Sequence, residues 1–246
     1  MDGLGIDRAL GVFAKGFCFT RSYSHPYESV ALGPMRLLRD QGNPRTPRAA
    51  EVVVNGTPAA EAAGLIRQAR LGRHFVCAYA SSDGDAKAVK EDWKGQAYRL
   101  LGTETLMAVR LDDHLALPQA SGVELVDSKV GCEALAKAAG SRQILSCHLG
   151  RPDLIRAYVA RDGDALVGWV RSVVCDRDGW VSNMYVRPDC RRRGIGSSLL
   201  ARMLEDDRAQ GLEHSILLAS AAGTKLYPHL GYETLGRLLV FCPKRR

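Results

Sequence analysis

The chain has no hydrophobic run long enough to cross a membrane. Spanning a bilayer takes roughly 18 to 20 consecutive apolar residues, and no stretch of the 246 residues comes close to that. The N-terminus has no basic segment followed by an apolar one, so we expect no secretory signal. With 46% hydrophobic and 25% charged residues, the chain can bury one full core or two small ones. The sequence therefore predicts a soluble globular protein with no membrane partner.

The chain also lacks the cysteine and histidine patterns of metal or redox sites. The seven cysteines are odd in number and scattered, and no two of them form a Cys-x-x-Cys pair. This usage predicts reduced thiols and a cytoplasmic location. The isolated histidines show no ligand spacing, so we expect no metal site; those considered are His74, His114, His148, His214 and His229.

A formal net charge of +7 raises the question of nucleic-acid binding. Part of the excess lies in residues 187–193 and in the tail at 244–246. No basic run alternates with aromatic residues, and no helix-turn-helix or zinc-finger spacing occurs. We therefore predict no nucleic-acid partner, since a polyanionic small molecule accounts for the first cluster.

Two familiar phosphate-binding sequences are absent. The chain has no Gly-Lys-Ser/Thr ending of a Walker A loop, and Leu199 stands where a dinucleotide fingerprint needs a third Gly or Ala. In their place, residues 180–186 predict a strand that Pro188 ends, and apolar residues from Ile195 onward recur at helical spacing. The turn between them holds three arginines, Gly194 and Gly196. A helix N-terminus behind such a turn is suited to binding an anion.

The pattern Arg191-x-x-Gly194-x-Gly196 resembles the pyrophosphate-binding motif of the GNAT superfamily of N-acetyltransferases. A second block follows one strand later, at residues 220–232. It resembles the GNAT signature in which a helix carries a tyrosine, here Tyr227, and ends at Leu-Gly-Phe/Tyr, here residues 230–232. The two blocks stand in the order that this family has.

The resemblance implies acetyl-CoA as the co-substrate. Its diphosphate would lie on the turn and its pantetheine along the preceding strand, and Ser220 stands where the family usually has an asparagine. The implied cofactor-binding residues are Met184, Tyr185, Val186, Arg191, Arg192, Arg193, Gly194, Ile195, Gly196, Ser197 and Ser220. Tyr227 is the implied catalytic residue, because the family tyrosine commonly protonates the departing thiolate.

The resemblance further implies direct transfer of an acetyl group to a primary amine of a small molecule or peptide. Strand positions that often carry glutamate in the family are Trp180 and Ser215 here, so the general base stays open among Asp176, Asp178, Glu213 and His214. The alternative function is a non-catalytic acyl-CoA-binding regulatory protein. The acceptor and the oligomeric state, a homodimer included, are not fixed by the sequence.

The predicted fold is an α/β (α+β) chain with a GNAT-like mixed, mostly antiparallel central sheet flanked by helices. Residues 111–122 mix turn and polar residues and predict a linker. Residues 119–246 are the expected GNAT domain, with a short helix at 132–139, three antiparallel strands joined by turns at 161–164 and 176–179, and the two blocks described above.

Residues 1–115 are expected to form either a degenerate GNAT-like lobe or an unrelated α/β lobe. The patterns predict extended chain at 17–35, strands at 50–55, 74–79 and 104–110, and helices at 57–69 and 86–100. The connection at 55–58 has one glycine and no arginine, so no second pyrophosphate site is expected. Arg21, His25 and Tyr27 surround a proline-fixed bend and are the candidate acceptor-binding residues.

Overall fold

A computed structural model describes residues 3–42, 48–221 and 223–244. The chain divides into two compact units. The first unit covers residues 5–107, 218–222 and 234–246, and the second covers residues 1–4, 108–217 and 223–233. The tail residues Arg245 and Arg246, singled out above for their charge, lie outside the described residues. None of the helices in the described residues is long and apolar enough to span a membrane.

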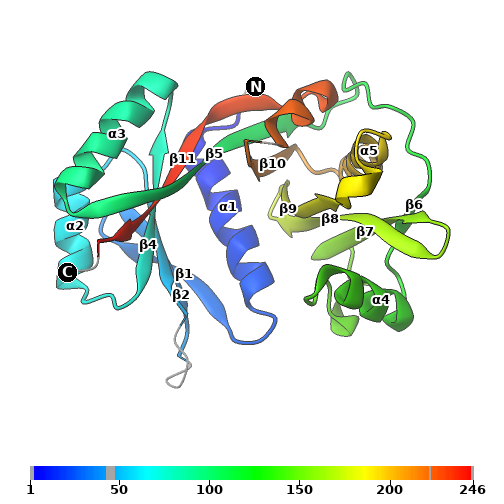
Figure 1. The fold of residues 1–246 in the computed structure, drawn as a ribbon, viewed down its shortest axis with the longest axis horizontal. Helices are drawn as coiled ribbons and strands as arrows, with labels where there is room; N and C mark the ends of the chain where they lie inside the picture. The colour runs from blue at the N-terminus through cyan, green and yellow to red at the C-terminus, as the bar shows by residue number, and fades with distance from the viewer. Residues whose placement is uncertain (1–2, 43–47, 222, 245–246) are drawn as a thin grey trace. The chain divides into compact units, whose positions relative to one another are not determined.

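The first unit is a sheet with helices on both faces (Figure 1). Its elements in chain order are α1 (Ile6–Arg21), β1 (Tyr27–Leu32), β2 (Met35–Asp40), β3 (Ala50–Val54), α2 (Ala59–Gln68), β4 (His74–Ala80), α3 (Asp83–Gly95), β5 (Tyr98–Arg110) and β11 (Glu233–Pro243). The strands are ordered β1-β2-β3-β4-β11-β5. Only the β3–β4 pair is parallel among the pairs β1–β2, β2–β3, β3–β4 and β4–β11.

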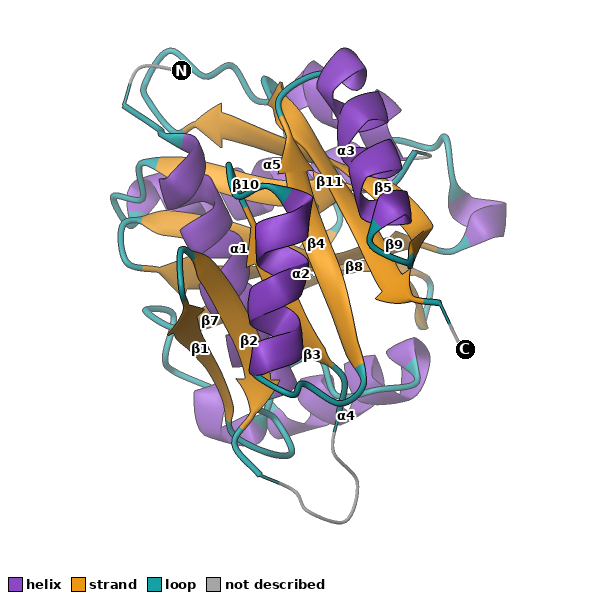
Figure 2. Cartoon of the chain, turned by 90° about the vertical axis from the view of Figure 1, so that its left-hand side faces the viewer, coloured by secondary structure: helices purple, strands orange, loops and turns teal. Residues whose placement is uncertain are grey.

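One face of this sheet packs against α2 and α3. Val52, Val54, Val76 and Ala78 alternate along β3 and β4 and are almost fully buried with Trp93 of α3. Figure 2 shows α2 in front of these strands. The last strand, β11, adds Leu239 and Phe241 to the same core. A strand from the C-terminal end of the sequence therefore completes the hydrophobic core of the N-terminal lobe.

The opposite face of the first sheet carries α1, and here the prediction of mostly extended chain for residues 17–35 is wrong for residues 17–21, although residues 27–32 form a strand as predicted. Residues 17–21 continue the helix α1, and two strands follow. Aromatic residues favour strands when taken alone, yet Phe13 and Phe17 are one helical turn apart and their rings meet at 5.8 Å. Phe17 also meets Tyr27 of β1 at 6.0 Å. Packing of this apolar face overrides the local preference.

Several other predicted boundaries in the first unit also differ from the structure. The helix predicted at 86–100 begins at Asp83, where the Ser82 side chain caps it, and ends at Gly95. Ala97 has a left-handed φ of +65° and turns the chain into β5, which starts at Tyr98 instead of Glu104. The helix predicted at 57–69 begins at Ala59, with Pro58 as its N-cap.

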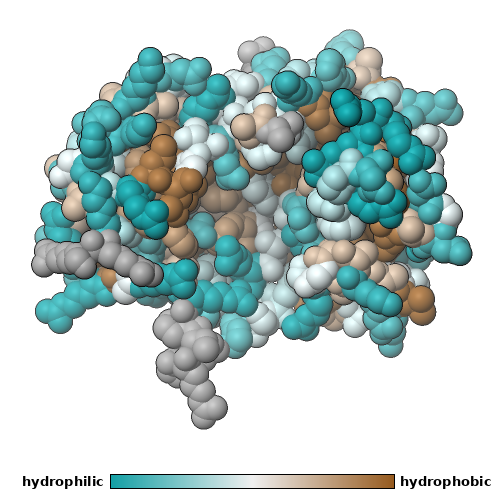
Figure 3. Space-filling view, viewed as in Figure 1, coloured by the Kyte–Doolittle hydropathy of each residue, from teal (hydrophilic) through white to brown (hydrophobic). Residues whose placement is uncertain are grey.

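The second unit is a mostly antiparallel sheet between two helices, as the sequence predicts (Figure 1). Its elements are β6 (Val123–Leu125), α4 (Lys129–Ala139), β7 (Ile155–Asp162), β8 (Ala165–Cys175), β9 (Asp178–Val186), α5 (Ile195–Ala209) and β10 (His214–Ala219). The order is β6-β7-β8-β9-β10, and β9–β10 is the parallel pair. Figure 3 shows hydrophilic side chains gathered over α5.

A buried polar network fastens the C-terminal half of α5 to the sheet. Arg156 of β7 pairs with Asp207 of α5, and both side chains are 3% exposed or less. The Ser172 hydroxyl of β8 donates to the other oxygen of Asp207 at 3.0 Å, and Arg156 also donates to the carbonyl of Pro152 at 2.7 Å. Burial raises the pKa of the Asp207 carboxyl, while Arg156 and Ser172 oppose that rise.

The two units share one pattern of strand pairing. In the first, β1, β2 and β3 pair antiparallel, and α2 then leads to the parallel strand β4. In the second, β7, β8 and β9 pair antiparallel, and α5 then leads to the parallel strand β10. The proposal that the first lobe is a degenerate relative of the second gains support from this correspondence.

Candidate active site

The turn before α5 leaves the first backbone N–H groups of the helix without intrahelical hydrogen-bond partners. Arg192 and Gly194 both have left-handed φ values, +61° and +79°, and Gly194 is the N-cap of α5 without a side-chain cap. The first intrahelical bond runs from the Ser198 N–H to the Gly194 carbonyl at 3.0 Å. The N–H groups of residues 194–197 precede that bond, so they are the donors that a helix start offers to an anion.

The arginines of this turn have different surroundings. Arg191 donates from Nε to the Val186 carbonyl at 3.0 Å, and Arg193 pairs through Nη1 with Asp162 of the β7–β8 hairpin at 2.9 Å. These contacts fix the turn against its neighbours. The side chain of Arg192 is exposed. All three guanidinium groups keep positive charge beside the helix start, which favours an anionic ligand.

Two glycines, Gly196 and Gly168, allow the start of α5 to lie directly on the sheet. A Cβ on Gly196 would lie 3.2 Å from Met184 of β9 and 3.2 Å from Leu226. A Cβ on Gly168 of β8 would lie 3.0 Å from Leu199 of α5. Gly194 instead has open space around it and a positive φ. Gly196 thus allows α5 to pack closely on the sheet. Gly194 allows the left-handed backbone of the turn and leaves room for a ligand to approach.

Strands β9 and β10 part after a short paired stretch. Their register covers Asp178 to Trp180 on β9 and His214 to Ile216 on β10, and β9 runs on to Val186. Within that extension, two β9 residues, Asn183 and Met184, stand opposite one β8 residue. Asn183 has a left-handed φ of +51°. This β-bulge interrupts the hydrogen-bond ladder between β8 and β9 and changes the direction in which backbone N–H and C=O groups of β9 point.

Gln143, in the loop after α4, holds the bulge in place. Its side-chain oxygen accepts from the Asn183 amide, and its carbonyl accepts from Arg171 Nη1 at 2.9 Å. Arg171 also donates to the Ser182 hydroxyl at 2.8 Å. Gln143 and Arg171 are both buried. Sequence reasoning missed this network, although an arginine inside the apolar strand at 165–175 was a visible signal.

Tyr227 opens a 3-10 turn, Tyr227–Leu230, and is buried. Gly223 and Pro228 interrupt the region, so the helix that the family resemblance implied for residues 220–230 is replaced by two 3-10 turns. The Tyr227 ring meets Tyr232 edge-on at 5.5 Å. Burial raises the pKa of Tyr227 to about 12. Its neighbour Leu226 contacts the start of α5 at Gly196, so Tyr227 belongs to the same region as the turn.

Ser220 is exposed directly after β10 and belongs to the segment that groups with the first unit. Its role toward a cofactor stays a prediction. Ala222, in the same sequence block, lies outside the described residues.

The candidate acceptor residues lie at the end of α1 and the start of β1 in the first unit. Arg21 lies 4.6 Å over the Phe17 ring and 3.6 Å from the Glu51 carboxylate. The buried Tyr27 donates its hydroxyl to the Ala49 carbonyl at 2.8 Å. His25 is half-buried in the turn between the two. Arg21 and Tyr27 therefore support the fold of this unit, and acceptor binding by the three residues stays a prediction.

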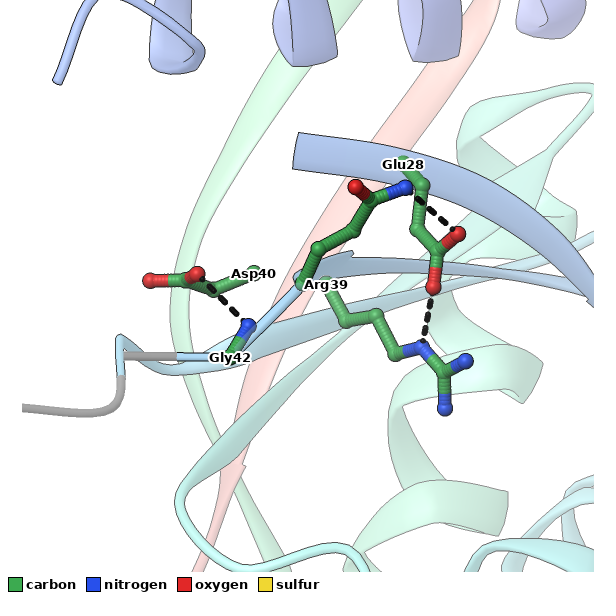
Figure 4. A pocket seen from close by; sticks show the side chains of 5 residues that line it. Glu28, Arg39, Asp40 and Gly42 are labelled. Atoms are coloured by element: carbon green, nitrogen blue, oxygen red, sulfur yellow. Dashed lines mark hydrogen bonds and ion pairs between the residues drawn. The ribbon is translucent and has the colours of Figure 1, made fainter. Parts of the chain in front are cut away.

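A surface pocket in the first unit is lined by Glu28, Arg39, Asp40, Gln41 and Gly42 (Figure 4). Glu28 accepts from Arg39 at 2.7 Å and from Gln41 at 2.9 Å, and the Arg39 bond lowers the pKa of Glu28 most. The Asp40 carboxylate accepts from the Gly42 N–H at 3.1 Å. Glu28 and the bonded oxygen of Asp40 are thus satisfied within the pocket, whereas Asp40 Oδ2 is buried with no hydrogen-bond partner among the described residues.

The four candidates for a general base lie near the β8–β9 turn and the start of β10. Asp176 is exposed at the turn. Glu213 forms an ion pair with Arg177 at 2.7 Å. Asp178 and His214 are buried and bonded to each other at 3.1 Å. Oxygen and nitrogen atoms of Asp178, Glu213 and His214 lie within 4.8 Å of one another, a spacing that could hold a metal ion. The guanidinium group of Arg177, however, already provides the positive charge beside Glu213.

Comparison with known proteins gives a family match to part of the chain. The family model described as an acetyltransferase (GNAT) domain matches residues 153–234. A GCN5-related N-acetyltransferase from Kribbella flavida matches with a TM-score of 0.69 and 20% identity, over 99% of this chain and 98% of that one. A GCN5-related N-acetyltransferase from Sphaerobacter thermophilus matches with a TM-score of 0.59 and 20% identity, over 84% and 76%.

A third structure is described as a tandem GNAT protein from the clavulanic acid biosynthesis pathway. It matches with a TM-score of 0.54 and 17% identity, over 85% of this chain and 77% of that one. At these identities the structural matches establish the fold alone. Curated proteins gave no match to the sequence.

Proposed function

We propose that the protein transfers an acetyl group from acetyl-CoA to the amine of an acceptor, since the acetyltransferase (GNAT) family model matches residues 153–234. The observation that carries the proposal is the joint placement of three features: the uncapped helix start behind the arginine turn, the bulge in β9, and Tyr227 beside the start of α5.

The turn would bind the diphosphate of acetyl-CoA. The N–H groups of residues 194–197 and the positive end of the α5 dipole both favour negative charge at this point. The pantetheine would then follow β9 from Val186 toward the bulge. An N–H at the bulge would donate to the thioester oxygen, where negative charge develops as the amine attacks.

Tyr227 would protonate the leaving thiolate. A phenol whose pKa is raised to about 12 by burial stays protonated at neutral pH, so it can donate when negative charge reaches the sulfur. A positioned acid of this kind typically contributes about 100- to 10,000-fold to the rate. Tyr227→Phe keeps the ring contact with Tyr232 and removes only the hydroxyl group that carries the acidic proton.

The test pairs binding with turnover. Acetyl-CoA should raise the melting temperature of the protein, and NAD or ATP should not do so comparably. CoA-thiol release should be measured over a panel of amines, amino acids, antibiotics and peptides. In Tyr227→Phe, turnover should fall by about 100- to 10,000-fold while acetyl-CoA affinity changes little. Tyr98→Phe, which removes a buried hydroxyl bonded to His74 in the first unit, is the matched control and should keep its turnover.

Binding of acetyl-CoA without transfer to any amine would support the alternative, a non-catalytic acyl-CoA-binding protein. Equal turnover in wild type and Tyr227→Phe would make Tyr227 a packing residue. No stabilisation by acetyl-CoA would contradict the proposed cofactor.

A further inference from the structure

The β-bulge of β9 carries an exposed amide, the side chain of Asn183. The residue has a left-handed φ of +51°, a conformation that asparagine adopts more readily than most residues. Its Nδ2 donates a hydrogen bond to Oε1 of Gln143. Its Oδ1 has no hydrogen-bond partner among the described residues. The bulge therefore holds an amide that is fixed through its nitrogen and open at its oxygen.

Two amides in series determine which atom of Asn183 is open. Nε2 of Gln143 donates to the Ser141 carbonyl at 3.1 Å and to the Ser141 hydroxyl at 2.8 Å. Because a backbone carbonyl only accepts hydrogen bonds, the nitrogen of Gln143 faces Ser141 and its oxygen faces Asn183. That oxygen also only accepts, so Asn183 turns its nitrogen toward Gln143. The carbonyl oxygen of Asn183 consequently points away from the loop after α4.

The amide lies on the face of the second sheet opposite α5. Ser172 of β8 binds Asp207 of α5, so Ser172 faces α5. Side chains alternate along a strand, and the neighbouring Arg171 therefore faces away from α5. Arg171 donates to the carbonyl of Gln143, which places Gln143 and the amide of Asn183 bonded to it on that same face.

The other bulge residue, Met184, faces the α5 side. A Cβ on Gly196, in the first turn of α5, would lie 3.2 Å from Met184. In the proposed function the start of α5 binds the diphosphate on this side, and an N–H at the bulge donates to the thioester oxygen. The side chain of Asn183 belongs to the bulge itself, so it stands beside the thioester on the face that the cofactor leaves open.

A stacked aromatic pair borders the amide on this face. The ring of Tyr185 stacks on Trp169 with 4.4 Å between the centroids and 23° between the planes. A Cβ on Gly168 would lie 3.0 Å from Leu199 of α5, so the neighbouring Trp169 faces away from α5. Trp169 is buried and Tyr185 is half-buried. The remaining surface of Tyr185 is an apolar wall for the carbon chain of an acceptor.

We propose that Asn183 positions the acceptor: its Oδ1 accepts a hydrogen bond from the N–H of a primary amine that attacks the thioester. The assignment rests on the proposed acetyl transfer and deepens it. As the amine nitrogen bonds to the acetyl carbon, the carbon–sulfur bond breaks and sulfur leaves with the electron pair. Tyr227 gives its proton to the sulfur, and the amine gives one proton to water.

The hydrogen bond to Asn183 strengthens during the attack. The amine nitrogen becomes positively charged as its lone pair bonds to carbon, and a hydrogen bond from a charged donor is stronger than one from a neutral donor. The oxygen of Asn183 is already oriented by Gln143, so little reorganisation is needed at that moment. An amide oxygen is not a base at neutral pH, so Asn183 orients the amine without taking its proton.

This arrangement predicts a preference for primary amines. A neutral primary amine has two N–H groups, one for the hydrogen bond to Asn183 and one to be released to water. An N-methylated amine has a single N–H and cannot do both. Its methyl group would also compete with the N–H for the space in front of the amide oxygen. The protein should therefore acetylate a primary amine faster than its N-methyl derivative.

The decisive variant is Asn183→Gly, because glycine keeps the left-handed backbone of the bulge while the amide is lost. The acceptor is the primary amine acetylated fastest in the CoA-thiol-release panel. Its kcat/KM should fall about 10- to 100-fold, and the affinity for acetyl-CoA in calorimetry should stay within about threefold. The preference over the N-methyl derivative should be lost. Asn55→Gly, which removes an amide bonded to Asp7 at 2.9 Å in the first unit, is the matched control and should behave as wild type.

A second measurement needs no turnover. With CoA bound to the wild-type protein, propylamine should shift the carbon-13 resonance of the Asn183 side-chain carbonyl in a saturable manner. Tetramethylammonium, which carries positive charge and no N–H, should not shift it. An equal response to the two probes would overturn the assignment.

Three outcomes of the variant experiment are also decisive. Unchanged kcat/KM and amine preference in Asn183→Gly would show that the amide does not position the acceptor. Loss of acetyl-CoA binding in this variant would place the amide in the cofactor site and overturn the assignment as well. Wild-type protein that binds acetyl-CoA and acetylates no amine would instead refute the proposed function.

Discussion

Glu51 should make the stability of the protein depend on pH in a direction opposite to that of an ordinary surface carboxylate. Its side chain is 13% exposed, with Arg21 at 3.6 Å and the Cys77 thiol at 3.9 Å. Burial raises the pKa of Glu51 from 4.5 to about 7, and Arg21 limits the rise. In the folded protein the carboxyl therefore binds its proton more tightly than in the unfolded chain.

The sign and size of the effect follow from proton linkage. Below pH 4.5 both states hold the proton and the full stability is present. As pH rises toward 7 the unfolded chain releases its proton first, so the free energy of unfolding falls. A pKa rise from 4.5 to about 7 corresponds to about 3 kcal/mol, at roughly 1.4 kcal/mol per pH unit.

The test is urea unfolding of wild type and Glu51→Gln at pH 4.5 and pH 8. Between these two values, wild type should lose about 3 kcal/mol more stability than the variant. Glu28→Gln is the control on strand β1 of the same sheet, where hydrogen bonds from Arg39 and Gln41 lower the pKa of Glu28; this variant should not share the effect. A difference near zero or of opposite sign for Glu51→Gln would refute the reasoning.

Four further results are expected. Arg156→Met should lower the free energy of unfolding by about 3–5 kcal/mol in urea titrations, because it leaves a buried carboxylate unpaired. Gly168→Ala should displace the start of α5 and weaken acetyl-CoA binding in calorimetry, whereas Gly102→Ala, with open space around it, should not. Gln143→Ala should release the Asn183 bulge and lower kcat more than acetyl-CoA affinity; an unchanged kcat would make it purely structural. Calorimetry should give one acetyl-CoA per chain, and two equal sites would contradict a degenerate first lobe.

The features predicted best from the sequence depend on local chemistry. Gly194, the arginines and the apolar spacing after Ile195 fix the strand–turn–helix at 180–209, and it forms as predicted. The turns at Gly163 and Asp176 likewise depend on a few adjacent residues, and both have positive φ values there. Such elements can be read from neighbouring residues because their conformational preferences act over a few positions.

The features that were missed depend on distant partners. The helical state of Phe17 follows from packing on Phe13 and Tyr27, which local preference opposes. The bulge at Asn183 depends on Gln143, forty positions earlier. Nothing in the local sequence around either residue reveals the partner. The structure adds contacts within the first unit for Arg21 and Tyr27, and acceptor binding by these residues stays a prediction.

The position of β11 has a consequence for how the chain folds during synthesis. The strand lies between β4 and β5, yet a ribosome completes β4 and β5 long before residues 233–243 emerge. Until then the first unit lacks Leu239 and Phe241 of its core, and the edges of β4 and β5 that β11 occupies are open to pairing with other chains. Domains commonly fold one after another as they emerge, but here the N-terminal lobe has to wait for the C-terminal strand. A ribosome that stalls before residues 233–243 emerge would thus leave an unfinished, aggregation-prone first half.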